Sequence, residues 1–204
     1  MNQGQIKINT PFGKYLYDLC VKHENIKTVV EIGTWYGMGS TECLIEGLKD
    51  SKREGISFVS LETNNQMYNV AVESWKGKLP EWAKLLHGSI VDVVEMDADN
   101  LGFQHQDESN WFDEDKNALL SCSNILSELP EIIDLLFLDG GEFTTKAEFW
   151  KLKDRARIVV LDDTTMRKCK DIRSYVIDHP LEYVVILDDP SHRGGVMVFE
   201  KIVK

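Results

Sequence analysis

The sequence predicts an α/β fold with a doubly wound, mostly parallel seven-stranded sheet that ends in an antiparallel strand. Three observations favour this fold. Short runs of apolar and β-branched residues alternate with amphipathic stretches along the chain. Several of these runs end in an acidic residue or a glycine. The last two runs are joined only by residues 188–194, and so short a connection indicates an antiparallel pair.

The individual elements follow from the same patterns. The first apolar run, KTVVEI at residues 27–32, has no polar alternation, which is typical of a strand buried on both faces. Strands are predicted at residues 27–32, 56–62, 83–87, 132–138, 157–161, 183–187 and 195–200. Helices are predicted at residues 39–48, 65–75, 89–96, 117–129, 143–152 and 165–178.

Residues 97–116 form an acidic stretch without a hydrophobic period. Aromatic residues and His105 are interleaved with its carboxylates. We interpret it as an insertion in a single domain that spans residues 1–204. Two interpretations stay open, a solvated surface loop and a mobile lid over a pocket.

Charge and cysteine content exclude several classes of protein. The formal net charge of −11 disfavours a broad nucleic-acid surface. The basic cluster at residues 167–170 is interpreted as a solvated helix face, with a phosphate contact as the alternative. The four cysteines form no metal-binding or redox pair, which favours a reducing compartment. No signal core or membrane-length apolar run is present, so a cytoplasmic location and no membrane partner are expected.

A doubly wound sheet binds its ligand at the carboxyl ends of its strands, so the residues there are the candidate site. The first strand leads into a turn with Gly33 and Gly37, followed by the amino end of a helix, as in nucleotide-binding loops. The spacing G-x-x-x-G-x-G differs from the dinucleotide fingerprint, and an ordinary tight turn is the alternative. The remaining candidates in this segment are Glu31, Thr34, Trp35, Tyr36 and Ser40.

The next two strands end in further candidates. Glu62 is a carboxylate that accepts hydrogen bonds from the two hydroxyls of a ribose, with a helix cap or a solvent-facing side chain as the alternative. Gly88 and Ser89 are candidates for the edge of an adenine, whereas His87 is expected to pack.

Three aspartates follow the fourth and fifth strands. Asp139 ends the fourth strand, and Asp162 and Asp163 end the fifth. Neighbouring strands lie about 5 Å apart, so these carboxylates are expected to converge. Oxygen-only ligands suit Mg²⁺. The alternative is that Asp162 or Asp163 caps the following helix.

The motifs VVEIGTWYGMGS, FVSLET, LLHGS, DLLFLDGG and IVVLDDT together resemble class I S-adenosylmethionine (SAM)-dependent methyltransferases, which have a Rossmann-like fold. The resemblance spans residues 27–200 and is strongest to small O-methyltransferases of the catechol and macrocin types. It implies that Glu31, Gly33 and Gly37 surround the methionine part of SAM, Glu62 the ribose and Ser89 the adenine. It also implies a metal at Asp139, Asp162 and Asp163.

The sequence departs from the family pattern at two places that concern the substrate side. The metal-dependent catechol enzymes carry a lysine three residues after the fourth-strand aspartate, and Glu142 stands here instead. The Pro-Gly-Gly turn before the fifth strand is replaced by residues 154–157 (DRAR).

The resemblance therefore implies Mg²⁺-assisted methyl transfer from SAM to a small hydroxylated acceptor such as a sugar or polyol. Asp139 and Glu142 are the candidate catalytic groups, with His192 and His105 as further candidate bases. A homodimer is left open.

Three other functions stay open. One is a non-catalytic cofactor-binding or assembly module with the same fold. Another is a nicotinamide-dependent oxidoreductase, which is disfavoured because Glu62 lies 29 residues after Gly33. The third is nucleic-acid methylation, which is disfavoured because Asp-Gly-Gly stands where base-amine enzymes carry Asn-Pro-Pro-Tyr.

Overall fold

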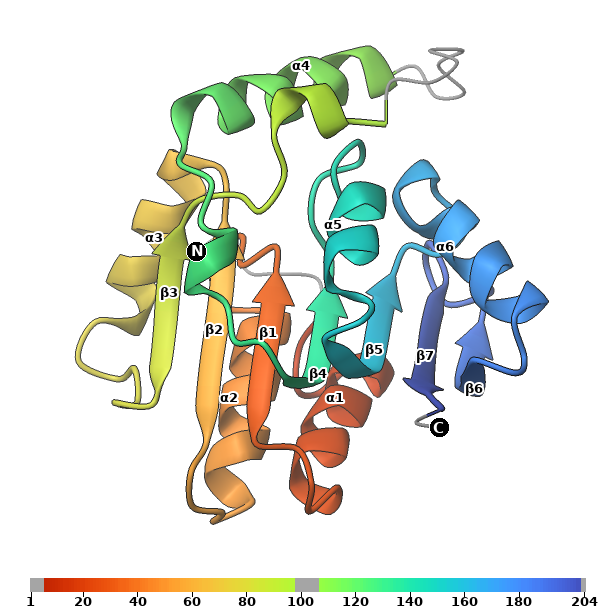
Figure 1. Ribbon diagram of the computed structural model, residues 1–204. Coiled ribbons are helices and arrows are strands. Elements are labelled where there is room, and N and C mark those ends of the chain that lie inside the picture. The colour runs from red at the N-terminus through yellow and green to blue at the C-terminus, as the bar shows by residue number, and fades with distance from the viewer. Residues whose placement is uncertain (1–5, 98–106, 203–204) are drawn as a thin grey trace.

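The computed structural model describes residues 6–97 and 107–202. Its strands form one seven-stranded sheet of order β3-β2-β1-β4-β5-β7-β6 (Figure 1). All neighbouring pairs are parallel except those of β7, which runs antiparallel to both β5 and β6. The predicted fold class is confirmed. The strands are β1 Thr28–Ile32, β2 Ser57–Glu62, β3 Ala83–His87, β4 Ile133–Leu138, β5 Ala156–Asp162, β6 Tyr183–Asp189 and β7 Val196–Lys201.

Helices cover both faces of the sheet (Figure 1). Side chains of α1, α2 and α3 pack with one set of strand residues, and those of α5 and α6 pack with the alternate set. In β1, for example, Val29 faces the first group and Val30 the second. The α-helices are α1 Pro11–Lys22, α2 Ser40–Asp50, α3 Asn65–Trp75, α4 Glu108–Ser121, α5 Thr145–Leu152 and α6 Arg167–Asp178. Two 3₁₀ turns are η1 Val93–Glu95 and η2 Leu126–Glu128.

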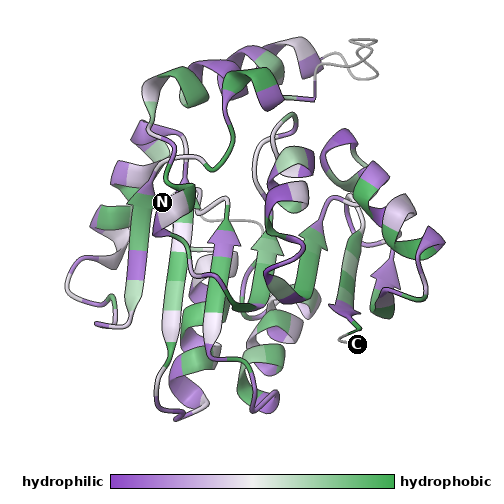
Figure 2. Ribbon diagram, in the orientation of Figure 1, coloured by the Kyte–Doolittle hydropathy of each residue, from purple (hydrophilic) through white to green (hydrophobic). Residues whose placement is uncertain are grey.

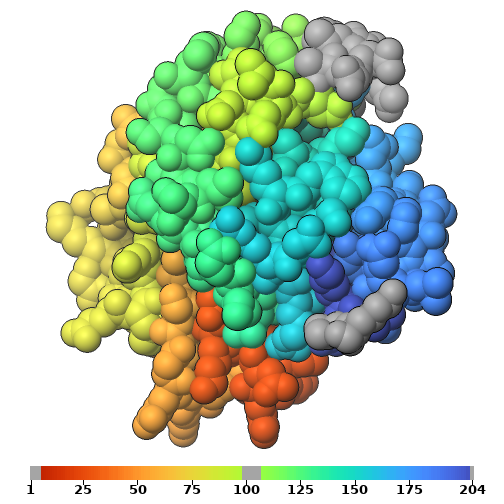
Figure 3. Space-filling view, viewed as in Figure 1, coloured from red at the N-terminus to blue at the C-terminus, as the bar shows by residue number. Residues whose placement is uncertain are grey.

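Burial on both faces explains why the strands read as continuous apolar runs. In Figure 2 the central strands are largely hydrophobic, while the helices carry both hydrophobic and hydrophilic residues. The space-filling view shows α5 and the segment before β4 covering much of the central sheet (Figure 3).

The order of the strands places the site. From β1 the chain proceeds outward to β2 and β3, then returns to β4 on the other side of β1. The connections that follow β1 and β4 therefore diverge, and a crevice opens at the carboxyl ends of these strands. In Figure 1 these ends point toward α4, which lies across them.

Helix α1 was not predicted from the sequence, although its start is encoded there. Thr10 is its N-cap, and its hydroxyl accepts a hydrogen bond from the Gly13 amide at 3.2 Å. Pro11 occupies the first turn, where its missing N–H costs nothing. Phe12, Leu16 and other residues of one face are buried against the sheet.

The sequence prediction is wrong for part of residues 97–116, because α4 already begins at Glu108 and ends at Ser121 rather than running over 117–129. Its apolar face is narrow, and only Glu108 and Leu119 are buried. With so few buried positions, the sequence of α4 shows only a weak helical periodicity of apolar residues. The predicted helix at 89–96 is reduced to η1. His105 lies outside the described residues.

The four cysteines are free thiols, and three of them are buried, as expected for core residues. Among the described residues, none of the helices combines the length and apolarity that crossing a bilayer requires.

Candidate functional site

A cavity of about 380 Å³ opens at the carboxyl ends of the parallel strands. Residues after β1, β2, β3 and β4 line it, and α4 contributes Glu114, Asp115 and Ala118. Most of the residues predicted to bind the cofactor belong to its wall: Gly33, Thr34, Trp35, Tyr36, Gly37, Ser40, Glu62, Gly88, Ser89 and Asp139. The predicted topological position of the site is therefore matched by a real cavity.

The turn after β1 requires glycine at Gly33. Its φ of +99° lies in the region that L side chains rarely adopt, and a Cβ there would lie 2.1 Å from the Asp139 carbonyl oxygen. Gly37 has φ +73°, and its carbonyl accepts a hydrogen bond from the Trp75 indole at 2.7 Å. The turn is thus held against β4 on one side and α3 on the other.

Glu31 is the one predicted cofactor residue that does not line the cavity. It is fully buried, and its carboxylate accepts hydrogen bonds from the hydroxyls of Ser40, Thr41 and Ser60 at 2.6–2.7 Å. Burial raises its pKa to about 7, and the three hydroxyls oppose that rise. Through its bonds to Ser40 and Thr41, Glu31 holds the amino end of α2 in place. Ser40 at this helix end lines the cavity.

Glu62 directly joins the second strand to the glycine turn. One carboxylate oxygen accepts the Trp35 amide at 2.7 Å and the other accepts the Asn64 amide at 2.8 Å. The side chain is buried, and burial raises its pKa. A carboxylate has about four lone-pair positions, so these two bonds leave acceptor capacity toward the cavity.

The residues that follow β3 form another part of the cavity wall. The Ser89 hydroxyl already bonds both the amide and the carbonyl of Val91. Gly88 is required by packing, since a Cβ would lie 2.7 Å from the Ile125 side chain. His87 packs against Tyr68 and bonds the Thr63 carbonyl at 3.1 Å, as expected for a packed histidine.

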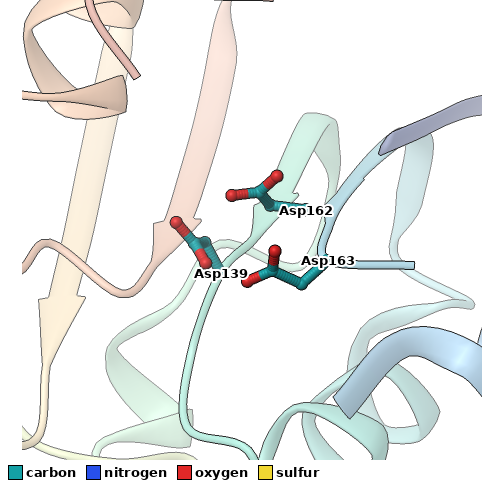
Figure 4. A group of neighbouring side chains, drawn as sticks. All are labelled: Asp139, Asp162 and Asp163. Atoms are coloured by element: carbon teal, nitrogen blue, oxygen red, sulfur yellow. The ribbon is translucent and has the colours of Figure 1, made fainter. Parts of the chain in front are cut away.

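The three aspartates at the ends of β4 and β5 do converge. One oxygen from each of Asp139, Asp162 and Asp163 lies within 4.8 Å of the others, and the carboxylates point toward one another (Figure 4). Asp139 and Asp163 line the cavity, whereas Asp162 lies behind them with 1% exposure.

Two basic side chains occupy this acidic cluster. The Lys168 ammonium lies 2.5 Å from Asp139 Oδ1 and 3.0 Å from Asp163 Oδ2. The Arg193 guanidinium lies 2.9 Å from Asp162 Oδ2. These ion pairs use one oxygen of each carboxylate, and a divalent cation bound to the remaining oxygens would be repelled by the two basic groups at close range. The predicted Mg²⁺ therefore does not fit these residues as they are arranged.

The charged groups in the cluster shift one another's pKa values. Burial, followed by the charges of Asp139 and Asp163, raises the pKa of Asp162 to about 7. Burial works to lower the pKa of Lys168, but Asp139 and Asp163 outweigh it and hold that pKa well above its ordinary value. Lys168 is therefore a permanent positive charge at neutral pH.

Two of the predicted catalytic residues lie away from the cavity wall. The Glu142 carboxylate turns back and accepts the Lys168 backbone amide at 3.2 Å, so it caps the start of α6. The His192 ring packs against Phe12 with ring centroids 5.7 Å apart. Neither side chain is placed to accept a proton from a ligand in this cavity.

Sequence reasoning missed several wall residues. Lys168 belongs to the basic cluster that was interpreted as a solvated face, yet its side chain is 7% exposed and points inward. Asp115 accepts the Phe143 amide at 2.9 Å, and burial raises its pKa to about 6. Glu148 is 1% exposed with one unpaired oxygen, and burial raises its pKa to about 8. Only the fold brings these residues to the strand ends.

Neither a protein-family model nor a curated protein sequence matches the chain. Solved structures do. The SAH-bound methyltransferase PaMTH1 of Podospora anserina aligns with a TM-score of 0.63 at 16% identity, covering 94% of this chain and 78% of that one. The O-methyltransferase of Bacillus cereus in complex with SAH aligns at 0.59 and 19% identity, covering 94% and 82%.

A third similar structure is TomG of Streptomyces achromogenes, an O-methyltransferase involved in tomaymycin synthesis and solved with SAM. It aligns with a TM-score of 0.62 at 14% identity, covering 97% of this chain and 82% of that one. Structural similarity at such low sequence identity shows the fold alone, so the activity has to be argued from the residues of the site. The chain has the same fold as these three methyltransferase structures.

Proposed function

We propose that this protein is a SAM-dependent O-methyltransferase that acts on a small hydroxylated molecule such as a sugar or another polyol. The observation that carries the proposal is Glu62, a buried carboxylate that contacts the glycine turn and lines the cavity beside the strand-order switch. Such a position suits the paired hydroxyls of a ribose.

The donor set of the cavity is compatible with SAM. A volume of about 380 Å³ lies in the range of small-molecule sites. Glu62 would hold the ribose through its remaining lone pairs. The turn at residues 33–39 and the amino end of α2 would hold the methionine part, because helix N-terminal amides favour a carboxylate. Gly88 and Ser89 would border the adenine.

SAM, when bound, supplies a methyl group on a sulfonium, which an acceptor oxygen displaces in line while the electron pair of the C–S bond passes to sulfur. The protein must orient the acceptor and receive its hydroxyl proton. We assign proton acceptance to Asp139, which lines the cavity from the end of β4. Glu142 and His192 are not assigned this role because they do not line the cavity.

The acidic wall supports a polyol as the acceptor. Glu114, Asp115, Asp139 and Asp163 all line the cavity. Carboxylates accept hydrogen bonds from hydroxyl groups and repel phosphates, so neutral, hydroxyl-rich molecules are favoured. Mg²⁺ assistance is not part of this proposal, because the positive charges of Lys168 and Arg193 are already paired with the three aspartates and would repel the ion.

A transfer assay tests the proposal. The protein is incubated with methyl-labelled SAM and pools of sugars, polyols, phenols and amines, and both labelled product and SAH are measured. We expect transfer to a hydroxylated pool, and at least about a hundredfold slower transfer with Asp139→Asn, because a general base contributes roughly 10²–10⁴-fold. Asp178→Asn, an exposed site on α6, is the matched control. Transfer only to amines, or an unchanged rate in Asp139→Asn, would contradict the assignment.

A further inference from the structure

We infer that the ammonium of Lys168 takes the place of a divalent cation in this site and binds the acceptor oxygen as a fixed positive charge. The inference rests on the proposed methyl transfer and names the group that holds its acceptor. It makes the reaction independent of metal.

The position of the ammonium is that of an ion shared between strand ends. It bridges Asp139, which follows β4, and Asp163, which follows β5, at 2.5 and 3.0 Å. An ammonium has three protons, and these two ion pairs use two of them. Because Lys168 also lines the cavity, its third proton is available to a ligand there.

The position of Lys168 in helix α6 is by itself unfavourable for a buried positive charge. Lys168 lies in the first turn of α6, where the helix dipole disfavours a positive charge. Its side chain is only 7% exposed, so it has also lost most of its hydration. Lys170, two residues later on the same helix, is exposed in the ordinary way. The two carboxylates offset both costs for Lys168.

Arg193 supplies the second positive charge in the aspartate cluster. It lies in the β6–β7 connection with φ +49° and pairs with the buried Asp162 at 2.9 Å. The three carboxylates are thus matched by two cations from the chain itself. Asp139 and Asp163 share the single ammonium of Lys168, so one of these two carboxylates can receive a proton while the other stays paired.

This arrangement assigns a role to each group during transfer. The acceptor oxygen accepts a hydrogen bond from Lys168 while its proton passes to Asp139. The oxygen then forms the new C–O bond as the C–S bond breaks, and the electron pair remains on sulfur. Lys168 stays protonated throughout and stabilises the negative charge that develops on the oxygen.

Manganese binding measured by electron paramagnetic resonance tests the inference without an acceptor. Wild-type protein is expected to bind Mn²⁺ no more tightly than a Kd of about 1 mM, the range of weak oxygen-ligand sites. Lys168→Met removes the charge and keeps an unbranched apolar side chain. With Asp139 and Asp163 freed from their ion pairs, this variant is expected to bind Mn²⁺ at least about tenfold more tightly than wild type. Lys170→Met is the matched control and is expected to behave as wild type.

Two results would overturn the inference. One is Mn²⁺ binding to wild type in the micromolar range, which stays measurable even if Lys168→Met fails to fold. The other is a folded Lys168→Met variant, verified by circular dichroism, with no gain in Mn²⁺ affinity. Calorimetric titration with SAH separates this failure from that of the proposed function. A protein that binds both SAH and Mn²⁺ refutes only the lysine assignment, whereas absence of SAH binding refutes methyl transfer itself.

Discussion

Replacing Glu148 by glutamine tests whether the buried acids of the cavity wall are protonated in the folded state. Glu148 lies on α5 with 1% exposure and one carboxylate oxygen without a hydrogen-bond partner. Burial is the main cause that raises its pKa from 4.5 to about 8. Between these two values the folded protein keeps a proton that the unfolded chain releases, so stability falls as pH rises through this window.

The size of this effect follows from the shift. From pH 5 to pH 7, keeping Glu148 protonated costs the wild type roughly 2–3 kcal/mol of unfolding free energy, at about 1.4 kcal/mol per pH unit once the unfolded carboxyl is ionised. Glutamine resembles the protonated acid and has no such cost. The free energy of unfolding of Glu148→Gln, relative to wild type, is therefore expected to rise by that amount over this interval.

Urea denaturation followed by circular dichroism at pH 5, 6 and 7 measures the difference. The other buried acids are present in both proteins, so the contributions of those that do not interact with Glu148 cancel. Glu73→Gln, an exposed site on α3, is the matched control for the exchange of a glutamate for a glutamine. A constant difference between Glu148→Gln and wild type across these pH values would refute the claim that Glu148 is held protonated.

Two further substitutions test the glycine turn and the Arg193–Asp162 ion pair. Gly33→Ala introduces a Cβ at φ +99° against the Asp139 carbonyl, so we expect a loss of at least about 1–3 kcal/mol in urea denaturation and weaker SAH binding. Unchanged stability would contradict the described turn. Arg193→Ala leaves the buried Asp162 without its ion-pair partner, and we expect a loss of about 3–5 kcal/mol at pH 8 that becomes smaller near pH 5, where Asp162 is protonated. A loss independent of pH would show that the pair does not stabilise the cluster.

The strands and the main cavity wall could be predicted because local signals determine them. Each strand is an apolar run, and a parallel sheet brings the residues that follow such runs to one edge. Gly33, Glu62 and Asp139 were located by this rule alone, and all three line the cavity.

The rest depends on tertiary contacts. Lys168 has the sequence surroundings of a surface lysine, and only the packing of α6 into the same core cluster as β4 and β5 turns it toward Asp139. Helix α4 has a weak hydrophobic period, so nothing local distinguishes it from an acidic loop. Glu142 stands beside Asp139 in the sequence, but it bonds the amide of Lys168 instead of facing the cavity. Helix α1 is the exception, because Thr10 and Pro11 mark its start in the sequence.

The central claim is that Glu62 and the glycine turn form a nucleoside site, and titration calorimetry with SAH tests it most directly. Wild-type protein is expected to bind SAH, and Glu62→Gln to bind it roughly tenfold to a hundredfold more weakly, since a hydrogen bond to a charged group contributes about 1.5–3 kcal/mol. Glu73→Gln is expected to bind as wild type does. A wild-type protein that releases no heat with SAH, or equal affinity in wild type and Glu62→Gln, would contradict the account.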